Sequence, residues 1–456
     1  MVRLWMNELA RIVFEENDSE RRSRCACRLC GETETSHALS VDDHFGRLYL
    51  YKCNACLSFY FDGDDPVIGY ETGVTEAFWL DYAQAGAGIT TMLAPIFAIS
   101  PMPKGPVLDV GCGFGFVVDF WSKLVAPSIG LEKSYYGQVG KDMLQANIQP
   151  YYLDEFVAKH PTSGFDIIYS SEVIEHVPSP KDFLDDLNRM LIEDTILILT
   201  TPSTTAVSSD TDQAKLIAAL SPGFHYTIIS EQHMAQMLER CDLNFKIETH
   251  GNQMIVWASR SALPEISYGT THWDDYLVYL EQLTKSDNSH LRGGALYRLF
   301  KDSLNIGKLE LARKTWPKLV DLARRTYSID LLNPDLSELM KINKPLARLD
   351  EFPSWLGQAL LFGGLHVGND TGDRRAKLRM IDAALRALKR RATVDLQFGQ
   401  EAELLLPFAE TQYTIALAEA LNVSLIKSES ATQDDALIQS LHALKETLSN
   451  RFPSSE

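Results

Sequence analysis

The sequence contains no long basic run that would offset its acidic composition. The formal net charge of the 456-residue chain is −18. A protein that binds nucleic acid irrespective of base sequence needs clustered lysine and arginine. We therefore expect no nucleic-acid partner.

Long uncharged hydrophobic stretches are also missing. The N-terminal segment MVRLWMNELARIVFEEND carries charges throughout, so it fits neither a signal peptide nor a membrane span. We expect a cytoplasmic protein with no transmembrane segment.

Cysteine is scarce, and its spacing favours metal binding over disulfides. The chain has seven cysteines, an odd number, and four of them form two Cys-x-x-Cys pairs. Without a secretory signal, such pairs indicate a zinc site. We expect one structural Zn²⁺, closed by four sulfur ligands: Cys27, Cys30, Cys53 and Cys56. Four unligated thiols are the alternative, and Cys25 is a spare thiol that could replace one ligand.

A glycine-rich turn is the most informative stretch that is present. In Pro106–Phe120, PVLDVGCGFGFVVDF, an apolar run ends at Gly111, Gly113 and Gly115, and an apolar segment of helical length follows. This pattern predicts a strand, a turn that accepts φ > 0, and a helix whose first N–H groups suit an anionic ligand group. The third glycine of the dinucleotide fingerprint would fall at Phe116, which disfavours a hydride-transfer enzyme. An ordinary tight turn is the structural alternative.

Acidic residues follow the neighbouring predicted strands. Asp109 stands just before the turn, and Glu132 follows the apolar run after it, where a carboxylate can accept both hydroxyls of a ribose. The segment FDIIYSSEVIEHV, Phe165–Val177, predicts a further strand that carries polar groups into a helix.

Together these motifs resemble class I S-adenosylmethionine (SAM)-dependent methyltransferases from about Ala83 to Ser259. The resemblance implies a Rossmann-like α/β core with a seven-stranded sheet, closed by an antiparallel pair near Ser259. It also implies that Glu172 positions the sulfonium or ammonium of SAM, or caps a helix. The other implied cofactor-binding residues are Asp109, Gly111, Gly113 and Gly115 around the methionine part, Glu132 at the ribose and Asp154 near the adenine.

Two histidines are candidates for the base that takes a proton from a hydroxyl acceptor. His176 follows the fourth predicted strand, and His225 lies in the long connection after the fifth. His225 falls in a region that resembles the acceptor loop of sugar methyltransferases. His176 has an alternative role in ordering the loop at a helix start.

The zinc module joined to this core resembles bacterial methyltransferases that act on sugars. Members that methylate carbon carry a second Rossmann-like domain downstream, whereas this chain continues with helical patterns. We therefore expect O-methylation of a sugar, as a nucleotide-sugar, glycoside or surface polysaccharide. A quinone-like or other small molecule is an alternative acceptor, and a non-catalytic scaffold is the alternative from another class.

The predicted organisation has three parts: residues 1–62, an N-terminal helix and the zinc module; residues 63–262, the methyltransferase core; and residues 263–456, an all-α domain. A helix is expected over Thr75–Phe97. Six helices are expected after it: Trp273–Leu283, Leu291–Leu304, Leu309–Thr326, Arg374–Arg391, Glu401–Leu421 and Ala436–Leu448. Gly-Gly and Gly-Asn-Asp mark loops between them, and Lys389–Arg391 reads as a solvated helix end. Binding of a protein partner, or self-association, is the expected role of this domain.

Overall fold

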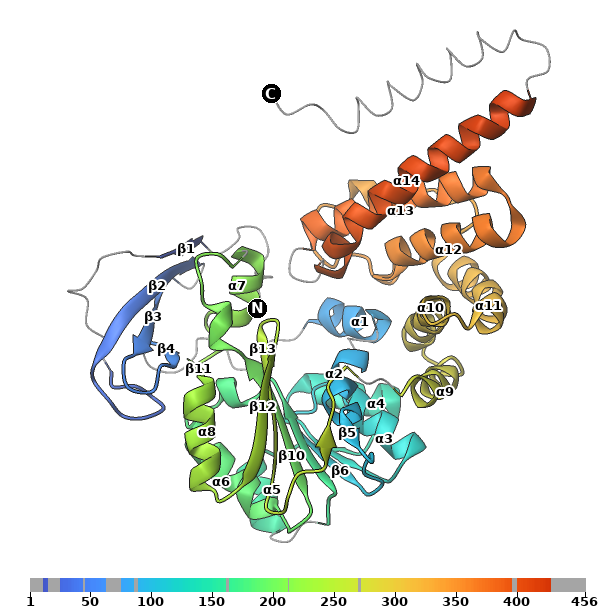
Figure 1. Cartoon of the computed structure of the whole chain (residues 1–456). Helices are drawn as coiled ribbons and strands as arrows, with labels where there is room; N and C mark the ends of the chain where they lie inside the picture. Colours follow the sequence, from blue (N-terminus) through green and yellow to red (C-terminus); the bar gives the residue numbers. More distant parts are fainter. Residues whose placement is uncertain are drawn as a thin grey trace. The chain divides into compact units, whose positions relative to one another are not determined.

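The computed structural model describes residues 11–14, 25–43, 46–62, 75–85, 89–160, 164–211, 213–269, 272–395 and 400–427 (Figure 1). The chain forms two compact units. One comprises Met1–Trp79 and Ala87–Gln282, and the other Leu80–Gly86 and Leu283–Glu456. None of the helices in the described part of the chain is long and apolar enough to cross a membrane.

The N-terminal module is a small antiparallel sheet with the strand order β1-β2-β3-β4-β11. Its strands are β1 (Arg11–Val13), β2 (Thr35–Asp43), β3 (Gly46–Cys53), β4 (Phe59–Phe61) and β11 (Thr227–Ile228). The predicted N-terminal helix is wrong for Arg11–Val13, which pair with β2; the rest of that segment up to residue 24, apart from Phe14, lies outside the described residues. The strand β11 comes from much later in the chain, so this module is completed by the core.

The core contains a seven-stranded sheet in the order β12-β13-β10-β9-β6-β7-β8. The five strands from β10 to β8 run parallel, and β13 and β12 close the sheet as an antiparallel pair, as predicted. The strands are β6 (Val107–Val110), β7 (Ile129–Leu131), β8 (Ile148–Gln149), β9 (Ile167–Ser171), β10 (Ile196–Pro202), β12 (Asn244–His250) and β13 (Gln253–Ser259). A separate pair joins β5 (Ile99–Ser100) to β14 (Glu265–Ile266).

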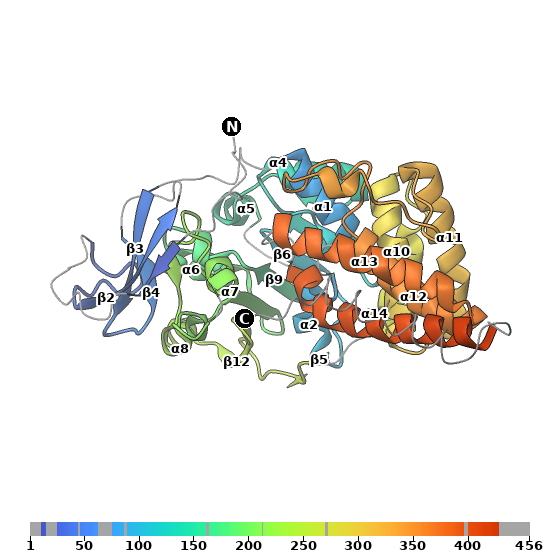
Figure 2. The same cartoon turned by 90° about the horizontal axis from the view of Figure 1, so that it is seen from above.

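Helices cover both faces of the large sheet, which explains why β6 and β10 are buried along their whole length (Figures 1 and 2). On one face α5, α6 and α8 contribute buried residues such as Phe156, Leu184 and Met237. On the other, Phe120 of α3 contacts Phe97 of α2 and Tyr279 of α9. The helices of this unit are α2 (Ile89–Phe97), α3 (Phe116–Leu124), α4 (Tyr135–Leu144), α5 (Leu153–Lys159), α6 (Pro180–Met190), α7 (Gln213–Leu220), α8 (Glu231–Arg240) and α9 (Trp273–Leu283), with short 3-10 turns at Ile174–His176 and Thr204–Ala206.

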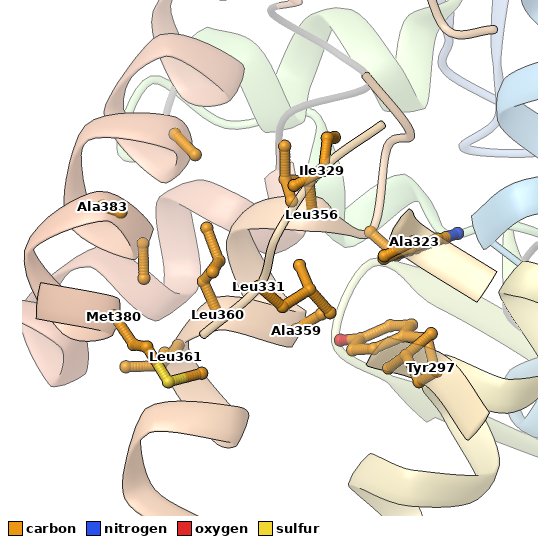
Figure 3. Close-up of a cluster of buried hydrophobic side chains, with 14 of the residues drawn as sticks. Tyr297, Ala323, Ile329, Leu331, Leu356, Ala359, Leu360, Leu361, Met380 and Ala383 are labelled. Carbon is orange, nitrogen blue, oxygen red and sulfur yellow. The ribbon is translucent and has the colours of Figure 1, made fainter. Parts of the chain in front are cut away.

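The second unit is helical, as predicted, but it includes one helix that the sequence analysis missed. Its helices are α10 (Ser289–Asn305), α11 (Leu309–Tyr327), α12 (Leu356–Thr371), α13 (Arg374–Val394) and α14 (Gln400–Lys427), with a 3-10 turn at Leu339–Lys341. Figure 3 shows Leu360 and Leu361 of α12 beside Met380 of α13 in its buried core. The helix expected at Ala436–Leu448 lies outside the described residues.

The Gly-Gly and Gly-Asn-Asp stretches expected to mark loops lie inside a helix instead. Gly363, Gly364 and Gly368–Asp370 are all part of α12. A Cβ at Gly363 would lie 2.2 Å from the Trp316 ring, so glycine is needed there for close packing. The prediction failed because a glycine that permits close approach has the same sequence signature as one that ends a helix.

The predicted helix over Thr75–Phe97 is two described helices, α1 (Glu76–Ala85) and α2. The second half of α1 belongs to the helical unit, where Arg391 binds Asp81 at 2.5 Å and Asp395 at 2.8 Å. Arg391 is buried, so the interpretation of Lys389–Arg391 as a solvated helix end is wrong for this residue. Sequence pattern alone could not reveal a carboxylate partner so far away in the chain.

Candidate functional site

The glycine turn follows β6 and has the backbone that its sequence predicts. Gly111, Gly113 and Gly115 have φ angles of 72°, 52° and 88°, in the left-handed region that side chains with a Cβ rarely adopt. A Cβ at Gly111 would lie 2.4 Å from Cγ2 of Val173, and one at Gly115 would lie 2.5 Å from Cδ1 of Ile148. Both backbone conformation and packing therefore require glycine here.

The start of α3 leaves backbone donors available beside this turn. Gly115 is the N-cap, and no side chain caps the helix. The first N–H groups of a helix lack partners within the helix and favour a carboxylate or another anion. This arrangement suits the carboxylate of an amino-acid moiety.

Glu132 follows β7 and ties the turn to the next strand. Its Oε2 accepts a hydrogen bond from the Gly113 amide at 3.1 Å, and its Oε1 accepts one from the Ser134 amide at 3.0 Å. The side chain is half-buried. The carboxylate thus lies next to the turn, where it can also accept hydroxyl donors of a ribose.

Asp109 lies on β6 and is almost fully buried, with 3% of its surface exposed. Burial, with a smaller contribution from the negative charge of Glu132, raises the pKa of Asp109 to about 8. A cationic ligand at the turn would stabilise the ionised carboxylate. Asp109 can therefore lose its proton and become negatively charged when a positively charged ligand binds at the turn.

Glu172 stands at the end of β9 with a φ angle of 54°. Its Oε1 accepts hydrogen bonds from Thr200 Oγ1 at 3.0 Å and Gln253 Nε2 at 2.9 Å. No side chain caps the 3-10 turn that follows, so the helix-cap alternative for Glu172 is wrong. Its contact with a cofactor stays a prediction.

The two predicted histidines lie together around a residue that the sequence analysis did not select. The rings of His176 and His225 have centroids 4.4 Å apart, and the carboxylate of Glu175 lies near both rings. Its Oε1 is 3.9 Å from His176 Nε2 and 4.0 Å from His225 Nε2. Burial lowers the pKa of His176 to about 4 and holds the pKa of His225 well below its usual range. Both rings are therefore neutral near pH 7.

Backbone pairing with the N-terminal module holds the loop that carries His225. The Tyr226 amide donates to the Glu175 carbonyl at 2.8 Å, and the Phe61 amide donates to the Tyr226 carbonyl at 3.1 Å. Ser230 Oγ donates to the Cys56 carbonyl at 2.5 Å. The cysteine module thus helps to position the histidine.

The four predicted metal ligands converge in that module. Their Sγ atoms all lie within 4.8 Å of one another, with Cys27 to Cys56 at 3.7 Å and Cys30 to Cys53 at 3.5 Å. Sulfur atoms bound tetrahedrally at about 2.3 Å from one zinc ion lie about 3.8 Å apart. Cys25 is not part of this group, and its thiol contacts Asp62 instead.

Asp154 occupies the first turn of α5, after β8, with its side chain exposed. Its place near an adenine stays a prediction. Glu175 is the residue that sequence reasoning missed. The signal available was an acidic residue directly before His176 in the motif that had already been singled out.

Residues 84–248 match a family model described as a methyltransferase domain. The chain is 26% identical over 163 residues to a ubiquinone biosynthesis O-methyltransferase from Glaesserella parasuis, and 35% identical over 91 residues to one from Klebsiella pneumoniae. These matches cover 34% and 19% of this chain and 63% and 37% of the two relatives. The chain thus spans less than two thirds of the length of either relative.

Among solved structures, a SAM dependent methyltransferase from Archaeoglobus fulgidus aligns with a TM-score of 0.33 at 15% identity. The alignment covers 40% of this chain and 99% of that one. In the sequence of this chain, the residues matched by the methyltransferase-domain model include the glycine turn, Glu132 and the group formed by Glu175, His176 and His225.

Proposed function

We propose that this protein is a SAM-dependent methyltransferase that methylates a hydroxyl group of a small acceptor. The observation that carries the proposal is the turn of three left-handed glycines tied to Glu132. The match of residues 84–248 to the methyltransferase domain supports it.

The residues around the turn fit SAM by their chemistry. The uncapped start of α3 suits the carboxylate of its methionine part, Glu132 suits its ribose, and Asp109 suits its positive charge. When bound, SAM supplies a methyl group already activated by its sulfonium. The protein must then orient the acceptor and accept its proton, and orientation alone can supply roughly 7–11 kcal/mol.

His225 or His176 is the proposed base. Both rings are neutral near pH 7, and a neutral ring has a lone pair that can accept a proton. His225 is held in the connection between β10 and α8, and the pairing of β11 with β4 limits the movement of this segment. Replacing His225 by glutamine should lower the rate of methyl transfer while leaving SAM affinity within about threefold, because the base contributes roughly 10²–10⁴ in rate.

A sugar hydroxyl is the first acceptor we propose, on the basis of the zinc-module architecture. A hydroxylated aromatic ring is the second candidate, and the printed function of the curated relatives, ubiquinone biosynthesis O-methyltransferase, favours it. Oxygen is the methylated atom in both cases.

We also propose that the four cysteines bind a structural zinc ion. The sulfur separations of 3.5 and 3.7 Å support it, because they are close to those of a tetrahedral zinc–thiolate site. Replacing Cys56 by serine should release one zinc ion per chain, as measured by elemental analysis. The same change at Cys241, a buried cysteine of the core, is the control and should leave zinc content unchanged.

The helical unit is proposed to bind a protein partner or a second copy of the chain. Its exposed apolar side chains include Leu404 and Phe408 on α14. Light scattering of the wild type and of a Leu404→Glu, Phe408→Glu variant would test self-association. If the wild type and the variant both have the mass of a monomer, self-association is excluded, and the proposed partner is a different protein.

The test of the function is transfer of a labelled methyl group from SAM to parallel panels of sugars and hydroxylated aromatic compounds. Product from sugars alone supports the first candidate, and product from aromatic compounds alone supports the second. A protein that binds SAM but labels neither panel would overturn small-molecule O-methylation and favour the scaffold alternative.

A further inference from the structure

We propose that the helical unit binds an uncharged sugar in a cavity lined by α11, the C-terminal end of α12 and the start of α13. The cavity has a volume of about 590 Å³, within the range of roughly 300–1,000 Å³ that is typical of small-molecule sites. All of its lining residues belong to the second compact unit. Only the role given to the sugar below, and not its binding, rests on the proposed function.

A fixed aromatic side chain forms one wall of the cavity. Trp316 of α11 is buried, and the centroid of its ring lies 4.8 Å from that of Phe300 and 6.3 Å from that of His366. Gly363 of α12 packs against the same ring so closely that there is no room for a Cβ. These contacts hold the indole in one orientation. The wall is therefore preformed, and binding does not have to order it.

His366 of α12 supplies hydrogen-bonding groups to the cavity. Its side chain is half-buried, and neither ring nitrogen has a hydrogen-bond partner among the described residues. Burial lowers the pKa of His366, so the ring is neutral near pH 7. A neutral imidazole has one N–H donor and one acceptor nitrogen. One ring can therefore accept from one hydroxyl and donate to another.

Pro317 leaves a backbone acceptor beside the same cavity. It lies inside α11 and lines the cavity together with Arg313. Proline has no N–H, so the Arg313 carbonyl lacks the helical hydrogen bond that position 317 would otherwise donate to it. The helix therefore has a carbonyl oxygen here that can accept a bond from a ligand.

The charges of the lining side chains balance. Arg313 and Arg379 contribute +2, and Asp370 and Asp373 contribute −2, so their sum is zero. Arg313 is paired with Asp370 at 2.7 Å and, next to the cavity, with Glu310 at 2.6 Å. Arg379 is exposed and has no ion pair or hydrogen bond within the described part of the chain. A charged ligand would upset this balance, so the cavity favours an uncharged one.

The mixture of groups identifies the class of ligand. The guanidinium of Arg379 donates hydrogen bonds, the carboxylates of Asp370 and Asp373 accept them, and His366 does both. A sugar ring carries several hydroxyls that donate and accept, and its C–H groups suit an apolar wall such as Trp316. A hydroxylated aromatic ring has fewer hydroxyls and would cover these polar groups without pairing them, which is costly.

The sugar in this cavity would be one unit of a glycan that is methylated at another unit. A polysaccharide is among the acceptors proposed above, and this role rests on that proposal. Binding at a second site makes the encounter of the acceptor with the catalytic site intramolecular and raises its effective concentration. An oligosaccharide should therefore be methylated with a lower KM than the corresponding monosaccharide.

Titration of the full-length, zinc-loaded protein with small neutral sugars tests the site. The probes are the methyl glycosides of glucose, galactose, mannose and rhamnose. Glucuronic and galacturonic acid are the charged counterparts, and catechol is the aromatic counterpart. Saturation-transfer NMR and calorimetry should show at least one neutral glycoside bound with a Kd of a few millimolar, about the affinity that a ligand of this size reaches.

Two variants locate the binding. Arg379→Ala should weaken sugar binding by about tenfold, and His366→Ala by about fivefold, as expected for the loss of a charge-assisted and a neutral hydrogen bond. Arg375→Ala is the matched control, because Arg375 is an exposed arginine of the same helix that does not line the cavity. It should bind sugar like the wild type. Circular dichroism of all three variants should match the wild type, because Arg379 and Arg375 are exposed and His366 is only half-buried.

Binding decides the proposal whether or not methyl transfer is found. The site is overturned if no neutral glycoside binds the wild type, or if Arg379→Ala and His366→Ala both bind sugar as tightly as the wild type. Tighter binding of the acids, or binding of catechol alone, would overturn the assignment to an uncharged sugar.

Activity separates this site from the proposed function. Sugar binding without methyl transfer to any acceptor would leave the site intact and overturn the function. If an oligosaccharide is methylated, Arg379→Ala should raise its KM by about tenfold and keep kcat within about twofold, because the cavity holds the acceptor and takes no part in the reaction. An unchanged KM would overturn the role of the cavity in holding the acceptor.

Discussion

Ser230 offers the most specific test of how the cysteine module controls the loop that carries His225. Its Oγ accepts a hydrogen bond from the His233 amide at the start of α8 and donates one to the Cys56 carbonyl. Replacing Ser230 by alanine removes both bonds. The hydrogen bond from Ser58 Oγ to the Cys56 carbonyl, which is longer at 3.4 Å, would remain.

The expected effect is the sum of two modest terms. Loss of the helix cap costs about 1 kcal/mol, and loss of the buried bond to Cys56 costs about 1 kcal/mol more. The pairing of β4 with β11 should then open more easily by about 2 kcal/mol, which is about 30-fold in an equilibrium constant. Ser179→Ala is the control, because Ser179 caps α6 with a bond to the Asp182 amide and has no link to the cysteine module.

Hydrogen exchange of the Phe61 amide measures this opening, because that amide donates to the Tyr226 carbonyl. Exchange should be about 30-fold faster in Ser230→Ala and within about twofold of the wild type in Ser179→Ala. Equal exchange rates in the wild type and Ser230→Ala would show that the hydrogen bonds of Ser230 do not hold the His225 loop against the cysteine module.

Two further predictions concern buried charges. The pKa of Asp109 is about 8, so this carboxyl is mostly protonated at pH 7, and binding of cationic SAM should release up to about one proton. SAM affinity should therefore rise as the pH rises towards 8 and level off above it. Calorimetry in buffers of different ionisation enthalpy measures the proton release. The Asp109→Asn variant should show neither the proton release nor the rise in affinity with pH. Arg391→Met should destabilise the helical unit by about 3–5 kcal/mol in urea unfolding, because it leaves Asp81 buried without its cation, while Asp395 keeps its pairing with Arg390 at 3.4 Å. A change below 1 kcal/mol would contradict this account of the ion pairs.

The core could be predicted because its signals are local. The apolar run before Gly111, the glycine spacing and the carboxylate at Glu132 all fall within one strand-helix-strand unit, and the structure brings them together. The two Cys-x-x-Cys pairs are likewise short motifs with a fixed spacing, and their sulfur atoms converge.

The remaining features depend on partners that are distant in the chain. The structure places Glu175 Oε1 4.0 Å from His225 Nε2, a proximity that the sequence does not show. The strand β11 is too short to be recognised without β4 beside it. The helix α12 was missed because Gly364 was taken as a loop signal, while its actual role is close approach to Ile381 of α13. Local sequence patterns do not reveal which distant residue a side chain contacts in the folded protein.

Equilibrium binding of SAM and S-adenosylhomocysteine to the zinc-loaded protein, measured by calorimetry, tests the central claim most directly. The wild type should bind both with micromolar affinity. Gly113→Leu should bind neither, because the added side chain would enter the turn at a φ of 52° and press on Tyr136. Gly307→Leu, at a glycine with a φ of 76° and open space around it, should bind like the wild type. Failure of the wild type to bind either compound, or unchanged binding in Gly113→Leu, would contradict the assignment of the glycine turn as the cofactor site.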